Sequence, residues 1–280
     1  MTARLLSLIA PTAALIVLAL SPAGRAQGPA AAAISSWKAS EAFAKGPLLL
    51  DRMASNRYQV FAVRRDAPGS VEHHALDTDI IMVLDGAATF VTEGVVTEPR
   101  SLRANEQSGS GIRDGKARRV ARGDVIIVPN GTPHWFSEVS PVVRYFAVKL
   151  RQASAEVRVP SRVEYWTGSE AFARGGLLFQ GTEGPFVRID ALRRDKPPGV
   201  ELHDLDTELV FTLGGGGTFL TGGSLSAPRP AGPNESTGES VTGGTPQLLD
   251  AGDVMAIPAG TPHWLREVRA PIEFFSVKVR

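Results

Sequence analysis

The sequence contains no cysteine, and this absence removes several kinds of chemistry at once. Without cysteine there are no disulfides, no iron–sulfur clusters, no zinc fingers and no thiol nucleophile. Histidine and the carboxylates are therefore the strong metal ligands that remain. An excess of charge of one sign is also lacking, because the net charge is only +1. This charge gives no reason to expect nucleic acid or an anionic membrane surface as a partner.

Several sequence motifs are missing as well. The glycine run 214–217 lies within a predicted β-hairpin rather than before a helix, so it does not form a phosphate-binding loop. The sequence has no nucleophile elbow, and it has no basic patch interleaved with aromatic residues. These absences argue against nucleotide-dependent, serine-hydrolase and nucleic-acid-binding functions.

An uninterrupted membrane-spanning run is lacking too. Residues 5–20 are apolar, but Pro11 interrupts them, and a bilayer span needs about 20 apolar residues. Arg4 precedes this run and small residues ending at Ala26 follow it, which is typical of a secretory signal peptide. We therefore expect a signal peptide over 1–26 and a mobile lead-in over 27–36. The mature protein is expected to be periplasmic or extracellular, without stable membrane insertion.

One stretch occurs twice. Gly123-Asp-Val-Ile-Ile-Val-Pro-Asn-Gly-Thr-Pro-His134-Trp recurs as Gly252-Asp-Val-Met-Ala-Ile-Pro-Ala-Gly-Thr-Pro-His263-Trp. In each copy an apolar run rich in β-branched residues predicts a buried strand, and the Pro and Gly predict a tight turn. A single histidine follows each turn at a fixed distance. A rigid strand and turn that aim one imidazole are well suited to holding a metal ligand.

The same offset of 129 positions (263 − 134) relates other parts of the chain. It pairs 40–46 with 169–175, Trp37 with Trp166, and 145–151 with 274–280. A repeat this long predicts two domains, each with its own core, rather than a solenoid. We place the domains at 37–151 and 163–280, with a linker over 152–162.

Short strand-like runs separated by Gly and Pro turns predict an all-β fold. Asp85-Gly86 predicts a hairpin, and Ser40 is expected to cap a short helix over 41–45. Two polar, glycine-containing segments, 93–122 and 222–244, are expected to be long loops, with at most one short strand in the first. The predicted strands of the first copy are 46–51, 58–65, 79–84, 87–92, 124–128 and 142–150.

The duplicated stretches resemble the second signature motif of the cupin superfamily, Gly-x5-Pro-x-Gly-x2-His. Part of the superfamily's first motif is also present, as Asp79-x6-Gly86 and Glu208-x6-Gly215. The motif also has a histidine shortly before the acid, and here His74 and His203 each lie five residues before it. The resemblance implies two tandem cupin-type jelly-roll β-barrels that arose by internal duplication.

The resemblance also implies one metal site in each barrel. The metal would be a divalent transition ion, and Fe, Mn, Ni and Zn all suit imidazole and carboxylate ligands. The superfamily's first motif begins with a pair of histidines, His-x-His. His74 and His203 match the second histidine of this pair, and Glu72 and Glu201 occupy the position of the first. These two glutamates could be ligands, catalytic acid/base groups or solvated charges at a strand edge. The implied ligands are His74, Asp79 and His134 in the first barrel, and His203, Glu208 and His263 in the second.

Three further pairs recur at the same offset. Trp135 and Trp264 either line a pocket or pack in the core. Two pairs of basic residues either meet an anionic substrate or are surface charges, and the second reading is favoured: Arg64 with Arg193, and Lys149 with Lys278.

Several functions fit this pattern. The favoured one is an exported metal-dependent enzyme, a dioxygenase, decarboxylase or isomerase, acting on a small oxygenated molecule. The alternatives are a barrel that binds a metal or small ligand without turnover, and a structural barrel. If only one barrel is active, the second is preferred, because Glu208 matches the motif better than Asp79. A homodimer is expected from the resemblance alone.

Overall fold

The computed structural model describes residues 33–44 and 46–280. The predicted signal peptide and most of the predicted lead-in lie outside the described residues, so the exported location stays a prediction. Among the described residues, none of the helices has the length and apolar character needed to cross a membrane.

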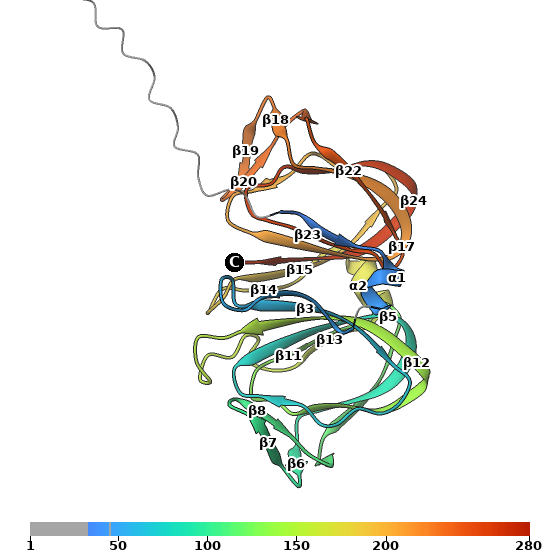
Figure 1. Ribbon diagram of the computed structural model, residues 1–280, viewed down its shortest axis with the longest axis vertical. Coiled ribbons are helices and arrows are strands. Elements are labelled where there is room, and N and C mark those ends of the chain that lie inside the picture. The colour runs from blue at the N-terminus through green and yellow to red at the C-terminus, as the bar shows by residue number, and fades with distance from the viewer. Residues whose placement is uncertain (1–32, 45) are drawn as a thin grey trace, which may run out of the picture. The chain divides into compact units, whose positions relative to one another are not determined.

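Each half of the chain provides six strands of a seven-stranded antiparallel sheet, and the two sheets confirm the predicted all-β, two-barrel fold (Figure 1). In the first sheet the order is β13-β11-β5-β12-β3-β2, with β10 also paired to β5. Its strands are β2 (Leu48–Arg52), β3 (Tyr58–Arg65), β5 (Asp77–Thr92), β10 (Lys116–Ala121), β11 (Val125–Val128), β12 (His134–Arg151) and β13 (Glu164–Trp166).

The second sheet repeats this plan in the order β1-β23-β17-β24-β15-β14, with β22 also paired to β17. Its long central strands are rich in Val, Phe and Leu, which suits a surface buried against a core. Its strands are β1 (Ser35–Trp37), β14 (Gly176–Gly181), β15 (Val187–Arg194), β17 (Thr207–Thr221), β22 (Thr245–Asp250), β23 (Val254–Ile257) and β24 (His263–Val279).

The two segments expected to be loops contain several short strands instead, so that prediction is wrong. Their polar residues pair in small antiparallel ribbons. In each barrel one of these ribbons includes a two-residue strand that ends in a candidate ligand, His74 in the first barrel and His203 in the second. Near the top of Figure 1, β18, β19 and β20 form this part of the second barrel. The short strands are β4 (His73–His74), β6 (Val95–Thr97), β7 (Arg100–Arg103), β8 (Glu106–Ser108) and β9 (Gly111–Arg113), followed by β16 (Leu202–His203), β18 (Ser224–Ser226), β19 (Arg229–Gly232), β20 (Glu235–Thr237) and β21 (Ser240–Thr242).

The hairpin expected at Asp85-Gly86 is also absent, because β5 runs through these residues without turning back. Gly86 has φ +76°, and a Cβ there would lie 1.9 Å from the carbonyl oxygen of Val142. The ladder between β5 and β12 shifts register at this point. The dipeptide therefore marks a bulge that bends a long strand, a second conformation that Asp-Gly suits.

One strand of each half pairs with the opposite sheet. Ser35 and Ser36, which were expected to belong to a mobile lead-in, pair with Ala256 and Met255 of β23. In the same way β13, which follows the predicted linker, pairs with β11. A large apolar cluster contains residues of both halves, including the contact between Phe146 and Phe211.

The helices α1 (Ala39–Ala44) and α2 (Gly168–Arg174) follow these exchanged strands. The first helix begins one residue before Ser40, so the predicted Ser40 cap is wrong. The backbone N–H of Ala39 donates instead to Asp253, and that of Gly168 donates to Asp124, both at 2.8 Å. Each Asp belongs to the duplicated Gly-Asp pair of the opposite half.

Candidate metal centres

The duplicated strand and turn deliver His134 and His263 to equivalent places. In the first barrel β11 ends, Gly131 takes φ +72°, and His134 opens β12. The N–H of Gly131 donates to the carbonyl of His74 at 2.7 Å. Backbone hydrogen bonds of 2.9 Å join Glu72 and His134 in both directions. The turn is therefore tied directly to the segment that carries the other candidate ligands.

The structure brings together all of the site residues expected from the sequence. In each barrel four side chains offer ligand atoms that lie within 4.8 Å of one another, so each group could hold a metal ion. Three of the four residues in each group are buried, and the glutamate at the position of the missing first histidine is the most exposed. The groups are Glu72, His74, Asp79 and His134, and Glu201, His203, Glu208 and His263.

The orientation of the motif histidines is set by a backbone carbonyl. In the second barrel Nδ1 of His263 lies 3.0 Å from the Thr261 carbonyl, which can only accept, so we assign the Nδ1 hydrogen to this contact. Nε2 of His263 then faces a Glu208 oxygen at 2.8 Å. A neutral ring would aim its lone pair at a carboxylate, so this contact requires a positive charge, which is either a proton on Nε2 or a metal ion bound by both side chains.

The second group fits a divalent metal. The Nε2 atoms of His203 and His263 are buried, and both face a Glu208 oxygen, at 3.4 and 2.8 Å, respectively. Burial alone would raise the pKa of Glu208, but the neighbouring His203 and His263 outweigh it and hold this pKa well below its usual range. Burial would lower the pKa of His203, but Glu201 and Glu208 raise it to about 9. The carboxylates thus attract positive charge to this point.

The second group opens into a cavity of about 410 Å³. Glu201 lies at its edge with 46% of its side chain exposed, and its carboxylate is 3.4 Å from Nε2 of His203. Arg194 also lines the cavity, and among the described residues it forms no ion pair with a carboxylate. Trp264 lines the same cavity, donates from Nε1 to the Pro198 carbonyl, and also packs against a small apolar cluster, so both readings of this tryptophan hold.

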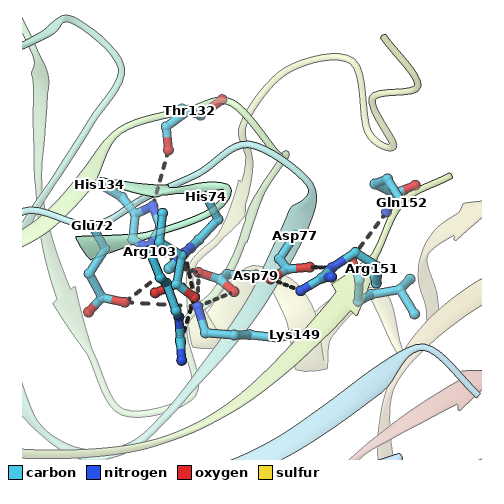
Figure 2. Close-up of polar contacts among 12 residues, drawn as sticks. Glu72, His74, Asp77, Asp79, Arg103, Thr132, His134, Lys149, Arg151 and Gln152 are labelled. Atoms are coloured by element: carbon cyan, nitrogen blue, oxygen red, sulfur yellow. Dashed lines mark hydrogen bonds and ion pairs between the residues drawn. The ribbon is translucent and has the colours of Figure 1, made fainter. Parts of the chain in front are cut away.

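In the first barrel a lysine enters the ligand group (Figure 2). Nζ of Lys149 lies 2.6 Å from Nε2 of His74 and 3.0 Å from an Asp79 oxygen. Only 16% of this side chain is exposed, so the surface-charge reading of Lys149 is wrong. Burial would lower the pKa of Lys149, but Asp79 and Glu72 raise it above its usual value. Lys149 is therefore a buried cation among the candidate ligands.

The carboxylates around Lys149 are held in their charged forms. Burial opposes this for Glu72, but His74, His134 and Lys149 lower its pKa to about 2. For Asp79 burial is again opposed, first by Lys149 and then by the two histidines, and the pKa is strongly lowered. The first group is thus a network of paired charges.

The first cavity, of about 360 Å³, has a different lining. Its walls include Phe61, Val63 and Phe136. Arg65 also lines it and donates to Glu72 at 3.1 Å and to Tyr145 at 2.9 Å. Every charged side chain that lines the first cavity pairs with a group of opposite charge or with a tyrosine, whereas Arg194 of the second cavity has only the Arg193 carbonyl as an acceptor among the described residues.

The sequence reasoning missed several residues of the two sites. Lys149 and Lys278 were assigned to the surface, although period-two alternation along β12 and β24 places them on the same face as Ala147 and Ser276. This alternation is a signal in the sequence from which the position of the two lysines could have been predicted. Glu106 and Glu235 lay in segments expected to be loops, and they approach Nδ1 of His74 and His203 at 3.8 and 3.4 Å.

The exposed basic pair behaves as expected. Arg64 pairs with Asp66, and Arg193 pairs with Glu273, and about half of each arginine side chain is exposed. These two arginines are surface charges.

The sequence matches no protein-family model and no curated protein sequence. Its fold is similar to that of a salicylate 1,2-dioxygenase from Pseudaminobacter salicylatoxidans, with a TM-score of 0.56 and 10% identity over 90% of this chain and 85% of that chain. It is also similar to the protein Ylba from E. coli, with a TM-score of 0.53 and 10% identity over 91% of this chain and 86% of that chain. A third similar structure is an oxalate decarboxylase from Lactobacillus farciminis in its formate complex, with a TM-score of 0.50 and 10% identity over 90% and 87%.

These neighbours are cupin-fold proteins, and the likeness shows that this chain has the cupin fold in its two-barrel form. At such low identity the likeness concerns the fold alone. The chemistry of the chain has to be argued from its own site residues.

Proposed function

We propose that the chain is an exported, metal-dependent enzyme whose catalytic centre is the second barrel, and that it acts on a small oxygenated acid. The observation that carries this proposal is that the buried Nε2 atoms of His203 and His263 converge on a Glu208 oxygen, at 3.4 and 2.8 Å, with no lysine or arginine bound to that carboxylate among the described residues. These three residues would hold the metal, with Fe, Mn, Ni and Zn as candidates. When bound, such a metal stabilises negative charge on substrate oxygens as a Lewis acid.

Glu201 is placed to move a proton. Burial would raise its pKa, but His203 and other neighbours hold the pKa below its usual value, so the carboxylate is charged at neutral pH. It borders the cavity and remains partly exposed. A charged carboxylate in that position can accept a proton from a bound substrate.

Arg194 is placed to bind the acid group of a substrate. Arg194 lines the cavity, and its guanidinium has no carboxylate partner among the described residues. A guanidinium binds a carboxylate with two parallel hydrogen bonds, which would fix the orientation of the substrate. Two structural neighbours are a salicylate 1,2-dioxygenase and an oxalate decarboxylase, and salicylate and oxalate are both small carboxylic acids. Dioxygenation and decarboxylation are therefore the favoured reaction classes.

The test combines metal analysis with turnover. Mature protein would be loaded separately with Fe(II), Mn(II), Ni(II) and Zn(II), and then assayed for oxygen uptake and carbon dioxide release on a panel of small mono- and dicarboxylic acids. We expect turnover with at least one metal and its loss in His263→Ala. Metal binding without turnover on any acid would favour the alternative, a non-catalytic binding barrel.

Two variants separate the roles of the residues. Glu201→Gln should keep the metal and lose turnover if the carboxylate transfers a proton, whereas loss of the metal would make Glu201 a ligand. Arg194→Met should raise KM for acids at least tenfold while the metal content stays constant. The matched control is Arg193→Met, because the neighbouring Arg193 is exposed and paired with Glu273.

The exported location has its own test. The mass of the protein recovered from the periplasm or the medium should correspond to a chain that begins near residue 27. A chain that retains residues 1–26 in the cytosol would contradict this part of the proposal.

A further inference from the structure

The ammonium group of Lys149 lies where a metal of the first barrel would have to bind. It is 2.6 Å from Nε2 of His74 and 3.0 and 3.1 Å from the two Asp79 oxygens. A metal bonded to these same donors would lie at about 2.0–2.2 Å from them. Such a metal would be in contact with the ammonium, and two cations repel strongly at contact distance in a site with little water.

The second barrel has the same lysine but keeps it out of the ligand group. Nζ of Lys278 lies 3.9 Å from Glu201 and 3.6 Å from Glu235, and it makes no hydrogen bond to His203 or Glu208 among the described residues. The shared backbone plan therefore does not by itself place the lysine among the ligands.

Two differences explain the contrast. Glu208 is one methylene longer than Asp79, and Ser276 stands where the first barrel has Ala147. The hydroxyl of Ser276 donates to an oxygen of Glu208, so this hydrogen bond takes the place of a lysine contact. In the first barrel the shorter Asp79 and the methyl group of Ala147 offer no such bond, and Lys149 binds the carboxylate instead.

The balance of charge follows the same division. In the first barrel the carboxylates of Glu72, Asp79 and Glu106 are met by Arg65, Lys149 and Arg103, respectively. In the second barrel Lys278 is the only lysine or arginine of the described residues that pairs with Glu201, Glu208 or Glu235. With neutral imidazoles, the three carboxylates of Glu201, Glu208 and Glu235 carry two negative charges more than Lys278 supplies, which matches one divalent ion.

We propose that the Lys149 ammonium is the resident cation of the first barrel, and that only the second barrel binds a divalent metal. The inference rests on the proposed function for the metal in the second barrel. It adds that the first ligand group, despite its cupin-like pattern, is a closed charge network.

Metal stoichiometry tests the inference without any substrate. Purified protein would be stripped with a chelator, incubated with Mn(II) or Zn(II), and measured by elemental mass spectrometry. We expect one equivalent per chain, retained in His134→Ala and lost in His263→Ala. Two equivalents, one of them lost in His134→Ala, would overturn the inference and leave the proposed function standing. No bound metal in the wild type would overturn both.

Variants that free the first site provide the decisive comparison. Lys149→Met should raise uptake from one to two equivalents, and adding His134→Ala should return it to one. Lys278→Met is the matched control, and it should leave the first site empty. Because Lys149→Met leaves Asp79 buried without its cation, it would be checked for folding by circular dichroism.

The double variant Asp79→Glu with Ala147→Ser keeps the lysine and rebuilds the second barrel's arrangement around it. It too should bind a second equivalent. If both the folded lysine variant and the double variant remain at one equivalent, Lys149 does not exclude the metal and the inference is wrong.

Discussion

The two barrels place four candidate ligands in the same way but neutralise them differently. In the first, Lys149 contacts Asp79 and His74, and its cavity is lined largely by apolar and paired groups. In the second, Ser276 binds Glu208, and the Nε2 atoms of His203 and His263 face the same carboxylate. Since the backbone plan is shared, the difference arises from side chains on neighbouring strands. A duplicated motif therefore does not guarantee duplicated chemistry.

The largest expected effect is on the stability of the metal-free protein. Asp79→Ala removes the main partner of a buried ammonium, and breaking such a pair costs about 3–5 kcal/mol. Glu208→Ala should cost about half as much or less, because Glu201 remains beside His203 and no lysine loses its nearest partner. Denaturant unfolding in the presence of a chelator would measure both, with circular dichroism and tryptophan fluorescence compared to check that the transition is two-state.

Equal losses of stability in Asp79→Ala and Glu208→Ala would contradict the proposed difference between the two barrels. In that case Asp79 and Glu208 would have the same role, and the position of Lys149 would not matter for stability. Asp79→Asn serves as a further control, because it retains the shape of the side chain while removing its charge.

The second effect is the pH dependence of metal binding. His203 has a pKa raised to about 9 by Glu201 and Glu208, against the opposing effect of burial, so it carries a proton at pH 7 that a metal must displace. Affinity should therefore rise as pH rises, by up to tenfold per unit between pH 7 and 9, or about 100-fold in total, and then level off.

Competition titrations with a metal indicator at several pH values would measure this slope. A flat profile between pH 7 and 9 would show that no proton leaves on binding. The first barrel should take up no metal anywhere in this range, because the pKa of Lys149 is raised above its usual value and the lysine keeps its charge.

The fold and the candidate ligand groups could both be predicted from the sequence, because the features that define them are local. Strand alternation and the rigid turn before His134 and His263 are local features, and the duplication doubled each signal. Local signals failed where one dipeptide suits two conformations: Asp85-Gly86 forms a bulge in β5 rather than a hairpin. The pairing of β1 with β23 has no local signal, because it depends on contacts between halves of the chain.

The role of Lys149 was out of reach for a different reason. Its alternation on β12 could be read, but its contact with Asp79 depends on the length of one acid and the absence of a hydroxyl on Ala147. Such differences decide between two nearly equivalent side-chain arrangements. They become visible only when the distances in both barrels are known.

The third prediction concerns a feature that the two halves share. Asp124 and Asp253 each accept hydrogen bonds from a helix N–H of the other half and from a backbone N–H of their own turn. Replacing either by Ala removes the acceptor of two partly buried backbone N–H groups and should cost about 1–2 kcal/mol. Thermal unfolding of the two variants should show similar decreases, in contrast to the unequal pair Asp79→Ala and Glu208→Ala. A clearly unequal result would show that the asymmetry extends beyond the ligand groups.

The smallest effect isolates one hydroxyl. Ser276→Ala removes the donor to Glu208 and makes this position identical to Ala147 of the first barrel. Loss of a supporting hydrogen bond to a ligand typically costs 10- to 100-fold in metal affinity, and we expect about tenfold here because Glu208 keeps its full length. Calorimetric titration with Mn(II) would measure this change, and Ser276→Thr, which retains a hydroxyl, should restore most of the affinity. An unchanged affinity in Ser276→Ala would mean that the length of the acid alone distinguishes the two barrels. In that case Glu208→Asp, with Ser276 kept, should be enough to bring Lys278 into the ligand group.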